Sequence, residues 1–183
     1  MGSRLLYFAG DRLSHAELTA ACLDGDVVEI GEGYAPADTV ETVALRAASL
    51  RPLLRDDLAA SHLTAAWIHG GLVDPPGRHT VQRASPQRRR ALVSRRLHYR
   101  DIRVSPGDLL RCGGTLVTSP ARTLADLLRE GSADYAAAAR AYAVAVPAVL
   151  EEARCWLEAS SLPYVRRARE ALTALAGQLD VTR

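Results

Sequence analysis

The residue pattern that most clearly suggests chemistry is a run of arginines in the middle of the chain. Residues 83–103 contain eight arginines and one acidic residue, Asp101, which gives this segment a formal charge of +7. The 82 residues before it carry six arginines against eleven acidic residues, and residues 104–183 carry nine of each. The chain has no lysine, so every basic side chain is a planar guanidinium that can hold a phosphate or carboxylate through two parallel hydrogen bonds.

We expect this segment, the basic band, to bind DNA, RNA or an acidic protein. Guanidinium groups on a turn and on strands can follow a phosphate backbone, and Tyr99 among them can stack on an unpaired base. The predicted nucleic-acid-binding residues are Arg88, Arg89, Arg90, Arg95, Arg96 and Arg100, and Arg83 and Arg103 complete the band. Two alternative roles for these arginines stay open. Alternate arginines can keep a half-exposed strand soluble, or the acidic N-terminal segment can pair with the band inside the molecule.

The sequence gives no catalytic signature. It contains no P-loop, no dinucleotide-binding glycine pattern, no G-x-S-x-G and no H-E-x-x-H. His79 and His98 fall on neighbouring predicted strands, which would suit a metal pair, but no third ligand accompanies them. The three cysteines are scattered and form no C-x-x-C. We therefore expect a protein that is not an enzyme and that uses neither a metal nor a cofactor.

Residues 115–131 predict a strand, a capped corner and a helix. Thr115–Thr118 is β-branched and apolar, which favours a strand. Ser119 is a good N-cap, Pro120 suits the first helical position, and Gly131 ends the helix. Within it, Arg122 and Asp126 are four residues apart and can pair, while Thr123 can bond back to the corner. We interpret these three residues as a polar staple that fixes the corner.

A second segment, Leu58 to His69, is predicted to be a helix. Trp67 is interpreted as a core anchor. His69 lies at the predicted C-terminus of this helix, where the macrodipole favours a histidine, and no acidic partner lies at a useful spacing. We therefore interpret His69 as a structural residue.

Together these two segments resemble AbiEi-type antitoxins, the regulatory half of type IV toxin–antitoxin systems. The resemblance rests on V-T-S-P-x-R-T-L-x-D-L-L, from Val117 to Leu128, and on A-A-W-x-H-G, from Ala65 to Gly70. A similar sequence precedes the nuclease domain of some short-patch-repair-like endonucleases. The residues that carry the resemblance are Trp67, His69, Gly70, Thr118, Pro120, Arg122, Thr123 and Asp126. It implies a regulator that binds its own promoter and neutralises a nucleotidyltransferase-like toxin without forming a tight complex with it.

The N-terminal residues 1–37 resemble the last helix and wing of the winged-helix domain that opens such antitoxins. They offer one helix, His15 to Leu23, and one hairpin, whereas a full winged helix has more helices. They also carry two arginines against six acidic residues. Because DNA affinity depends mainly on neutralising phosphates, we interpret this unit as a degenerate winged helix that packs or docks.

The expected fold is α+β. Residues 1–37 form the winged-helix-like unit, and residues 38–183 form a domain with an antiparallel sheet flanked by helices and an all-helical C-terminal tail, split at Pro147. No apolar run reaches membrane-spanning length, so we expect a cytoplasmic bacterial protein that does not enter a membrane. The alternative function is an orphan, nuclease-derived module that binds a protein or a nucleic acid without catalysis.

Overall fold

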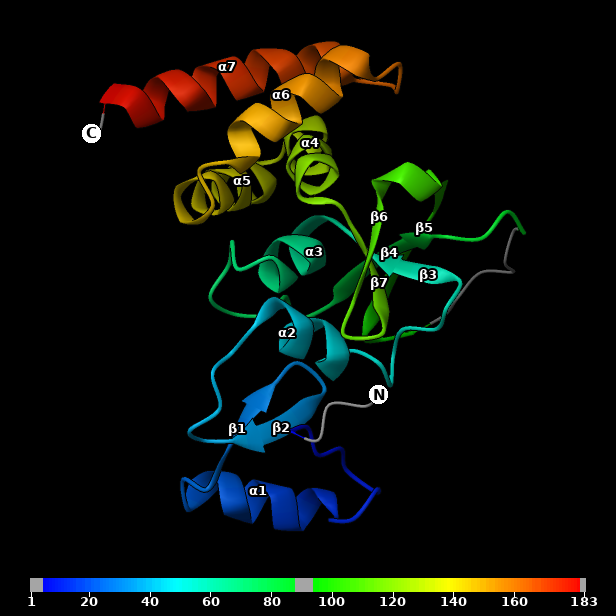
Figure 1. Ribbon diagram of the computed structural model, residues 1–183, viewed down its shortest axis with the longest axis vertical. Helices are drawn as coiled ribbons and strands as arrows, with labels where there is room; N and C mark the ends of the chain where they lie inside the picture. The colour runs from blue at the N-terminus through cyan, green and yellow to red at the C-terminus, as the bar shows by residue number, and fades with distance from the viewer. Residues whose placement is uncertain (1–4, 88–93, 182–183) are drawn as a thin grey trace.

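The chain has an α+β fold, as predicted, and its elements follow one another along an elongated molecule (Figure 1). The computed structural model describes residues 5–87 and 94–181. A small helix-and-hairpin unit lies at one end, a mixed β-sheet in the middle, and a group of helices at the other end (Figure 1).

The N-terminal unit consists of α1 (His15–Leu23) and a hairpin of β1 (Val27–Ile30) and β2 (Gly33–Pro36). Helix α1 begins with a capping box: the Ser14 hydroxyl oxygen accepts from the Glu17 N–H at 3.2 Å, and the Glu17 carboxylate accepts from the Ser14 N–H at 2.7 Å. Ile30 and Ala35 anchor the hairpin in the apolar cluster of the sheet. Before α1, Tyr7 forms an isolated bridge with Tyr34, and Ala9 forms one with Leu13.

The central sheet has the strand order β5-β4-β3-β7-β6. Its strands are β3 (Leu58–Ala60), β4 (His79–Arg83), β5 (Leu97–Arg103), β6 (Leu109–Cys112) and β7 (Thr115–Thr118). The prediction of a purely antiparallel sheet is wrong, because β3 pairs with β7 and β4 pairs with β5 in parallel. A one-turn 3-10 helix, η1 (Pro106–Asp108), precedes β6.

The prediction of one helix from Leu58 to His69 is also wrong. Residues 58–60 form the short central strand β3, and α3 (His62–Ile68) begins only after Ser61. Leu58, Ala59 and Ala60 are at most 1% exposed, because neighbouring strands pair with both edges of β3. Tertiary burial therefore overrides the helical preference of two alanines. The chain turns from strand to helix through His62, which has a left-handed φ of 51°.

The C-terminal half is helical, as predicted. Helices α4 (Pro120–Glu130), α5 (Ala133–Ala145), α6 (Val149–Ala159) and α7 (Val165–Val181) share one apolar core with Ala66 of α3. Pro147 separates α5 from α6, as expected, and Gly131 ends α4 with a left-handed φ of 67°. In the described residues, no helix is both long enough and apolar enough to span a membrane.

Helix α3 connects the two apolar cores. Ala66 belongs to the helical core with Leu124 and Tyr142, while Trp67 and Ile68 belong to the core of the sheet. The core of the sheet is closed by α2 (Val43–Ser49), which contributes Leu45 and Ala47 to it. This central position brings the C-terminal end of α3 next to the end of β7.

Candidate nucleic-acid interface

The two segments that carry the antitoxin resemblance meet in space at Thr118. His69 Nε2 donates to the carbonyl oxygen of Thr118 at 2.7 Å, and Thr123 Oγ1 donates to the same oxygen at 3.2 Å. The Thr118 and Thr123 hydroxyls are also 2.7 Å apart. The predicted polar staple at this corner is therefore present, and His69 extends it to α3.

His69 is built into the core rather than offered to a substrate. It follows the last helical residue of α3, and its ring stacks on Tyr142 with centroids 6.2 Å apart and an interplanar angle of 9°. Burial lowers the pKa of His69, an effect that the hydrogen bond to Thr118 opposes. Gly70, with φ at 84°, and Gly71 then turn the chain, and a Cβ at Gly71 would lie 2.2 Å from the Tyr142 ring, so that any side chain there would have to displace the ring.

Trp67 is the core anchor that the sequence predicts. Its ring is 1% exposed and belongs to the sheet core. The Arg46 guanidinium lies 5.3 Å from the centre of this ring, and it donates to the carbonyl oxygen of Leu72 at 2.8 Å. The indole is therefore packed from both sides and is not part of a surface.

Arg122 and Asp126 pair, but they do so inside the protein rather than on the exposed face of the helix. Arg122 Nε donates to Asp126 Oδ2 at 2.8 Å, and Arg122 Nη1 donates to Asp108 Oδ2 at 3.0 Å. Asp108 also accepts from Trp156 Nε1 at 2.6 Å, and Asp126 accepts from Arg129 at 2.7 Å. Arg122 and Asp126 are 2% and 1% exposed. The network joins η1, α4 and α6, and nothing in the sequence spacing pointed to Asp108 or Trp156.

The basic band is only partly available for a ligand. Arg88, Arg89 and Arg90 lie outside the described residues. Arg96 forms an ion pair with Glu32 of the N-terminal hairpin, and Arg100 pairs with Glu130 of α4. Arg83, which is 8% exposed, pairs with Asp101 at 3.0 Å and donates to the carbonyl oxygens of Ser85 and Pro86. The pairing of the acidic N-terminal unit with the band, left open by the sequence, occurs at Arg96.

Two band arginines remain exposed on the edge of the sheet. Arg95 precedes edge strand β5 and Arg103 ends it, and neither side chain forms an ion pair or hydrogen bond within the described parts of the chain. Of the five band arginines that the structure describes, Arg83, Arg96 and Arg100 are paired with Asp101, Glu32 and Glu130, and Arg95 and Arg103 are not paired. Intramolecular pairing therefore reduces the charge of the band without removing it.

Tyr99 differs from the expected stacking platform. It is half-buried, packs against the sheet core, and donates its hydroxyl proton to Asp101 at 3.1 Å. A base could stack on this ring only after the side chain left its packed position. The surface therefore offers positive charge to the phosphates of a nucleic acid, rather than an aromatic ring on which an unpaired base could stack.

A polar cluster beside the band was not predicted. His62 Nε2 lies 2.6 Å from Arg100 Nη1 and 3.4 Å from Glu130, and His62 Nδ1 lies 3.0 Å from the Ser61 hydroxyl. Hydrogen bonds from His62 and then from Arg100 hold the pKa of Glu130 well below its usual range. His62 and Ser61 are at most 1% exposed, while the side chains of Arg100 and Glu130 are 23% and 27% exposed. The left-handed φ of His62, which creates it, has no sequence signal such as a glycine.

The two strand histidines do not form a metal site together. His79 is opposite Leu97 in the β4–β5 ladder, and His98 is opposite Thr80, so the two side chains project from opposite faces of the sheet. His79 is buried 3.5 Å from Glu32, and burial together with Arg96 lowers its pKa to about 4. Across the described ranges, no group of three or more histidine, cysteine or acidic residues is arranged to hold a metal ion.

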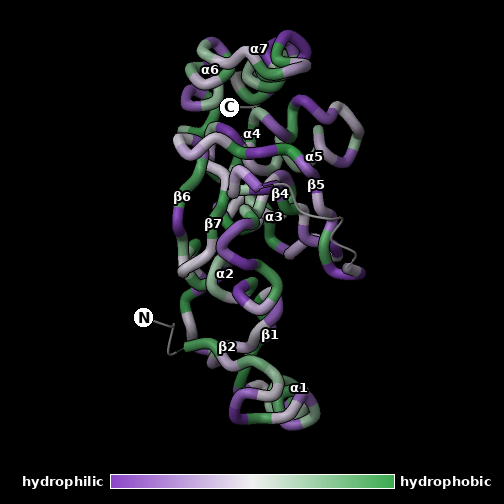
Figure 2. The backbone as a smooth tube through the Cα atoms, turned by 90° about the vertical axis from the view of Figure 1, so that its right-hand side faces the viewer, coloured by the Kyte–Doolittle hydropathy of each residue, from purple (hydrophilic) through white to green (hydrophobic). Residues whose placement is uncertain are grey.

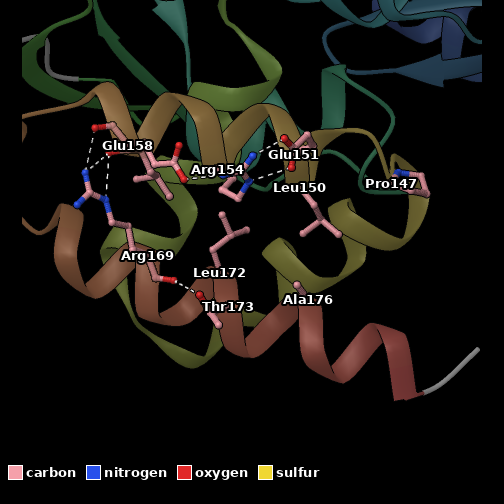
Figure 3. Close-up of a pocket in the computed structure, with 10 residues that line it drawn as sticks. Pro147, Leu150, Glu151, Arg154, Glu158, Arg169, Leu172, Thr173 and Ala176 are labelled. Carbon is pink, nitrogen blue, oxygen red and sulfur yellow. Dashed lines mark hydrogen bonds and ion pairs between the residues drawn. The ribbon is translucent and has the colours of Figure 1, made fainter.

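A groove of about 560 Å³ lies between α6 and α7 (Figure 3). Its floor is apolar, with Leu150, Leu157 and Leu172. Arg154 on its wall is held between Glu151 and Glu158, each at 2.6 Å. A cation already paired with two carboxylates is a poor phosphate ligand, so this groove is not a second nucleic-acid site.

A scan against protein-family models finds no match for the chain, and a search of curated proteins finds none either.

Proposed function

We propose that the protein is a bacterial, cytoplasmic, non-enzymatic regulator similar to AbiEi-type antitoxins, and that it binds nucleic acid through the basic band. The observation that carries the proposal is the formal charge of +7 in residues 83–103, within which Arg95 and Arg103 are exposed at the edge strand β5. A local excess of this size on an edge strand attracts the phosphate backbone, which supplies most of the affinity of DNA-binding proteins.

The contact between the two antitoxin-like segments also supports the proposal, because it shows that their polar residues serve the fold. Their most distinctive polar residues, His69, Thr123 and Arg122, are used to position α3, β7 and α4. Thr123 and Arg122 are buried, and His69 is half-buried. In this proposal the toxin partner is a nucleotidyltransferase-like protein that forms no tight complex with the chain, and the DNA ligand is the chain's own promoter.

The experiment that tests the proposal is a fluorescence-anisotropy titration with labelled duplex DNA from the chain's own promoter and with a scrambled duplex. Both titrations are repeated at low and at near-physiological salt. Promoter-selective binding that persists at near-physiological salt supports the antitoxin-like regulator. Equal binding to both duplexes that disappears with salt leaves only general polyanion attraction and contradicts the proposal.

A second candidate function is an orphan module that binds a protein partner. It is favoured by the intramolecular use of Arg83, Arg96 and Arg100, which removes three of the described arginines from a DNA contact. The neighbouring genes distinguish the two candidates. An adjacent gene for a nucleotidyltransferase-like protein supports the antitoxin, and a solitary gene supports the module.

A further inference from the structure

The free end of the N-terminal unit carries a patch that is both apolar and acidic. In both views α1 stands at the tip of the molecule, away from the helical half (Figures 1 and 2). Of the nine residues of α1, Leu18 alone is fully buried. The helix therefore has little packing of its own beyond the hairpin.

The patch, which we name the acidic end, is assembled by the turn after α1 and by the β1–β2 ladder. The Asp26 N–H donates to the Ala21 carbonyl oxygen at 2.9 Å, and the Ala37 N–H donates to the Asp26 carbonyl oxygen at 3.0 Å. These bonds hold the end of α1, the start of β1 and the segment after β2 together. The members of the acidic end are all exposed: Leu23, Asp24, Asp26, Val28, Asp38 and Val40.

The apolar members of the acidic end are strongly exposed for their type. Leu23 is 85% exposed, Val40 is 79% exposed and Val28 is 40% exposed. Each of them lies within two residues of Asp24, Asp26 or Asp38 in the chain, and exposed apolar residues rimmed by polar ones are a mark of an interaction surface. Association over such a surface removes apolar area from water and is therefore favourable.

The charges of the acidic end determine what kind of surface can bind it. Asp24, Asp26 and Asp38 carry three negative charges, and the last turn of α1 has no basic residue to offset the negative end of its dipole. Two copies of the acidic end facing each other would place like charges together, so a symmetric contact is opposed. A surface with arginines beside an apolar residue would be attracted.

Such a surface exists elsewhere on the same chain. Arg95 and Arg103 flank edge strand β5 without an ion pair in the described residues, and Ile102 beside Arg103 is 47% exposed. We propose that the acidic end of one copy docks on the β5 edge of a second copy. The contact joins two different surfaces, so it propagates head to tail into open chains of copies rather than closing a dimer. It does not depend on the proposed DNA binding.

Sedimentation velocity of the purified protein tests the proposal. At 50 mM NaCl, the weight-average mass should rise with protein concentration, and at 500 mM NaCl it should return toward the monomer mass. Substituting Leu23→Ser and Val40→Ser, which leaves the charge unchanged, should also reduce association. A wild-type chain that stays monomeric over the accessible concentration range at both salt concentrations would overturn the proposal.

Two sets of substitutions distinguish this contact from any other. The acidic-end variant carries Asp24→Arg and Asp38→Arg, and the edge variant carries Arg95→Ala and Arg103→Ala, so that the two altered surfaces do not attract each other. Each keeps one working surface, so each should be monomeric alone, while an equal mixture should form a 1:1 dimer of twice the monomer mass. Circular dichroism confirms that both variants are folded. Association of either variant alone, or two folded variants that do not combine, would contradict the head-to-tail contact.

The same variants separate this inference from the proposed function. The acidic-end variant keeps the basic band, so it should bind duplex DNA at least as well as the wild type. Loss of self-association with retained DNA binding would show that the two contacts can be separated, although both use Arg95 and Arg103. Self-association without DNA binding by any form would sustain the inference and reject the proposed function.

Discussion

His69 Nε2 donates to the carbonyl oxygen of Thr118 at 2.7 Å, and this bond joins the end of α3 to the end of β7. The same oxygen also accepts a hydrogen bond from Thr123, so this one carbonyl group links α3, β7 and α4. The bond explains why a histidine follows the helix without a catalytic partner: its proton is used to close a corner between two segments about fifty residues apart in the chain.

Replacing His69 with alanine should destabilise the fold. The substitution removes a partly buried hydrogen bond and leaves space beside Tyr142, so we expect the free energy of unfolding to fall by about 1–3 kcal/mol. Urea unfolding followed by circular dichroism measures it. His98→Ala, at an exposed position of β5, is the control and should change stability by less than about 0.5 kcal/mol. Equal stability of His69→Ala and the wild type would mean that the corner does not need this bond.

Replacing Arg122 with alanine should be among the most damaging single changes. It leaves Asp126 and Asp108 without the cation between them, and removing one partner of a buried ion pair typically costs about 3–5 kcal/mol. Thermal unfolding provides the measurement. Arg166→Ala breaks an i,i+4 pair with Glu170 whose arginine side chain is 94% exposed, so it should leave the melting temperature nearly unchanged. Similar losses in both variants would argue against a special role for the buried network.

Acid should destabilise the protein partly through His79. Burial and Arg96 lower its pKa to about 4 from 6.5, so between these two values the unfolded chain binds a proton that the folded chain does not. Stability must then fall as the pH falls through this window, by up to about 3 kcal/mol for a shift of this size. His79→Gln should flatten the dependence of unfolding free energy on pH between 6.5 and 4.

Glu32 and Arg96 face His79 and are unchanged in that variant, so the difference between the two pH profiles reports His79. Glu130 acts in another window: its lowered pKa contributes stability that is present above pH 4.5 and lost at lower pH. Parallel profiles for the wild type and His79→Gln down to pH 4.5 would refute the assignment.

Gly71→Ala tests the close packing behind the second antitoxin-like segment. The new Cβ would lie 2.2 Å from Tyr142 Cδ2, so the ring must move, and we expect a loss of about 1–3 kcal/mol. The same substitution at Gly77, where no atom lies within 4 Å, is the matched control. In a Tyr142→Leu background the Gly71→Ala change should cost less, because the obstructing ring is gone. An equal cost in both backgrounds would place the strain elsewhere.

The sequence predicted best those features that depend on neighbouring residues. The Ser119 cap, Pro120 at the first helical position and the left-handed Gly131 each act within one turn, and all three are found where expected. Thr123 also bonds back to the corner as predicted. Local chemistry of this kind needs no knowledge of the rest of the chain.

Features that depend on distant residues were missed. Residues 58–60 look helical by composition, and only pairing with β4 and β7 makes them a strand. Arg122 and Asp126 were correctly paired by spacing, yet their burial follows from α6 and η1, which lie far along the chain. The basic band was evident from composition, but its partners Glu32 and Glu130 are about sixty and thirty residues away.

The salt dependence of duplex binding tests the central claim, the basic band as a nucleic-acid interface, most directly. The measurement compares the wild type, the Arg95→Ala and Arg103→Ala double variant, and a control with Arg140→Ala and Arg166→Ala, which removes the same charge from exposed positions on α5 and α7. If the β5 edge contacts phosphates, affinity should fall in the band variant and the slope of log K against log salt should become shallower by about 2, roughly one for each lost contact. The control should keep the wild-type slope. An unchanged slope in the band variant, or an equal change in the control, would contradict the claim that this band is the interface.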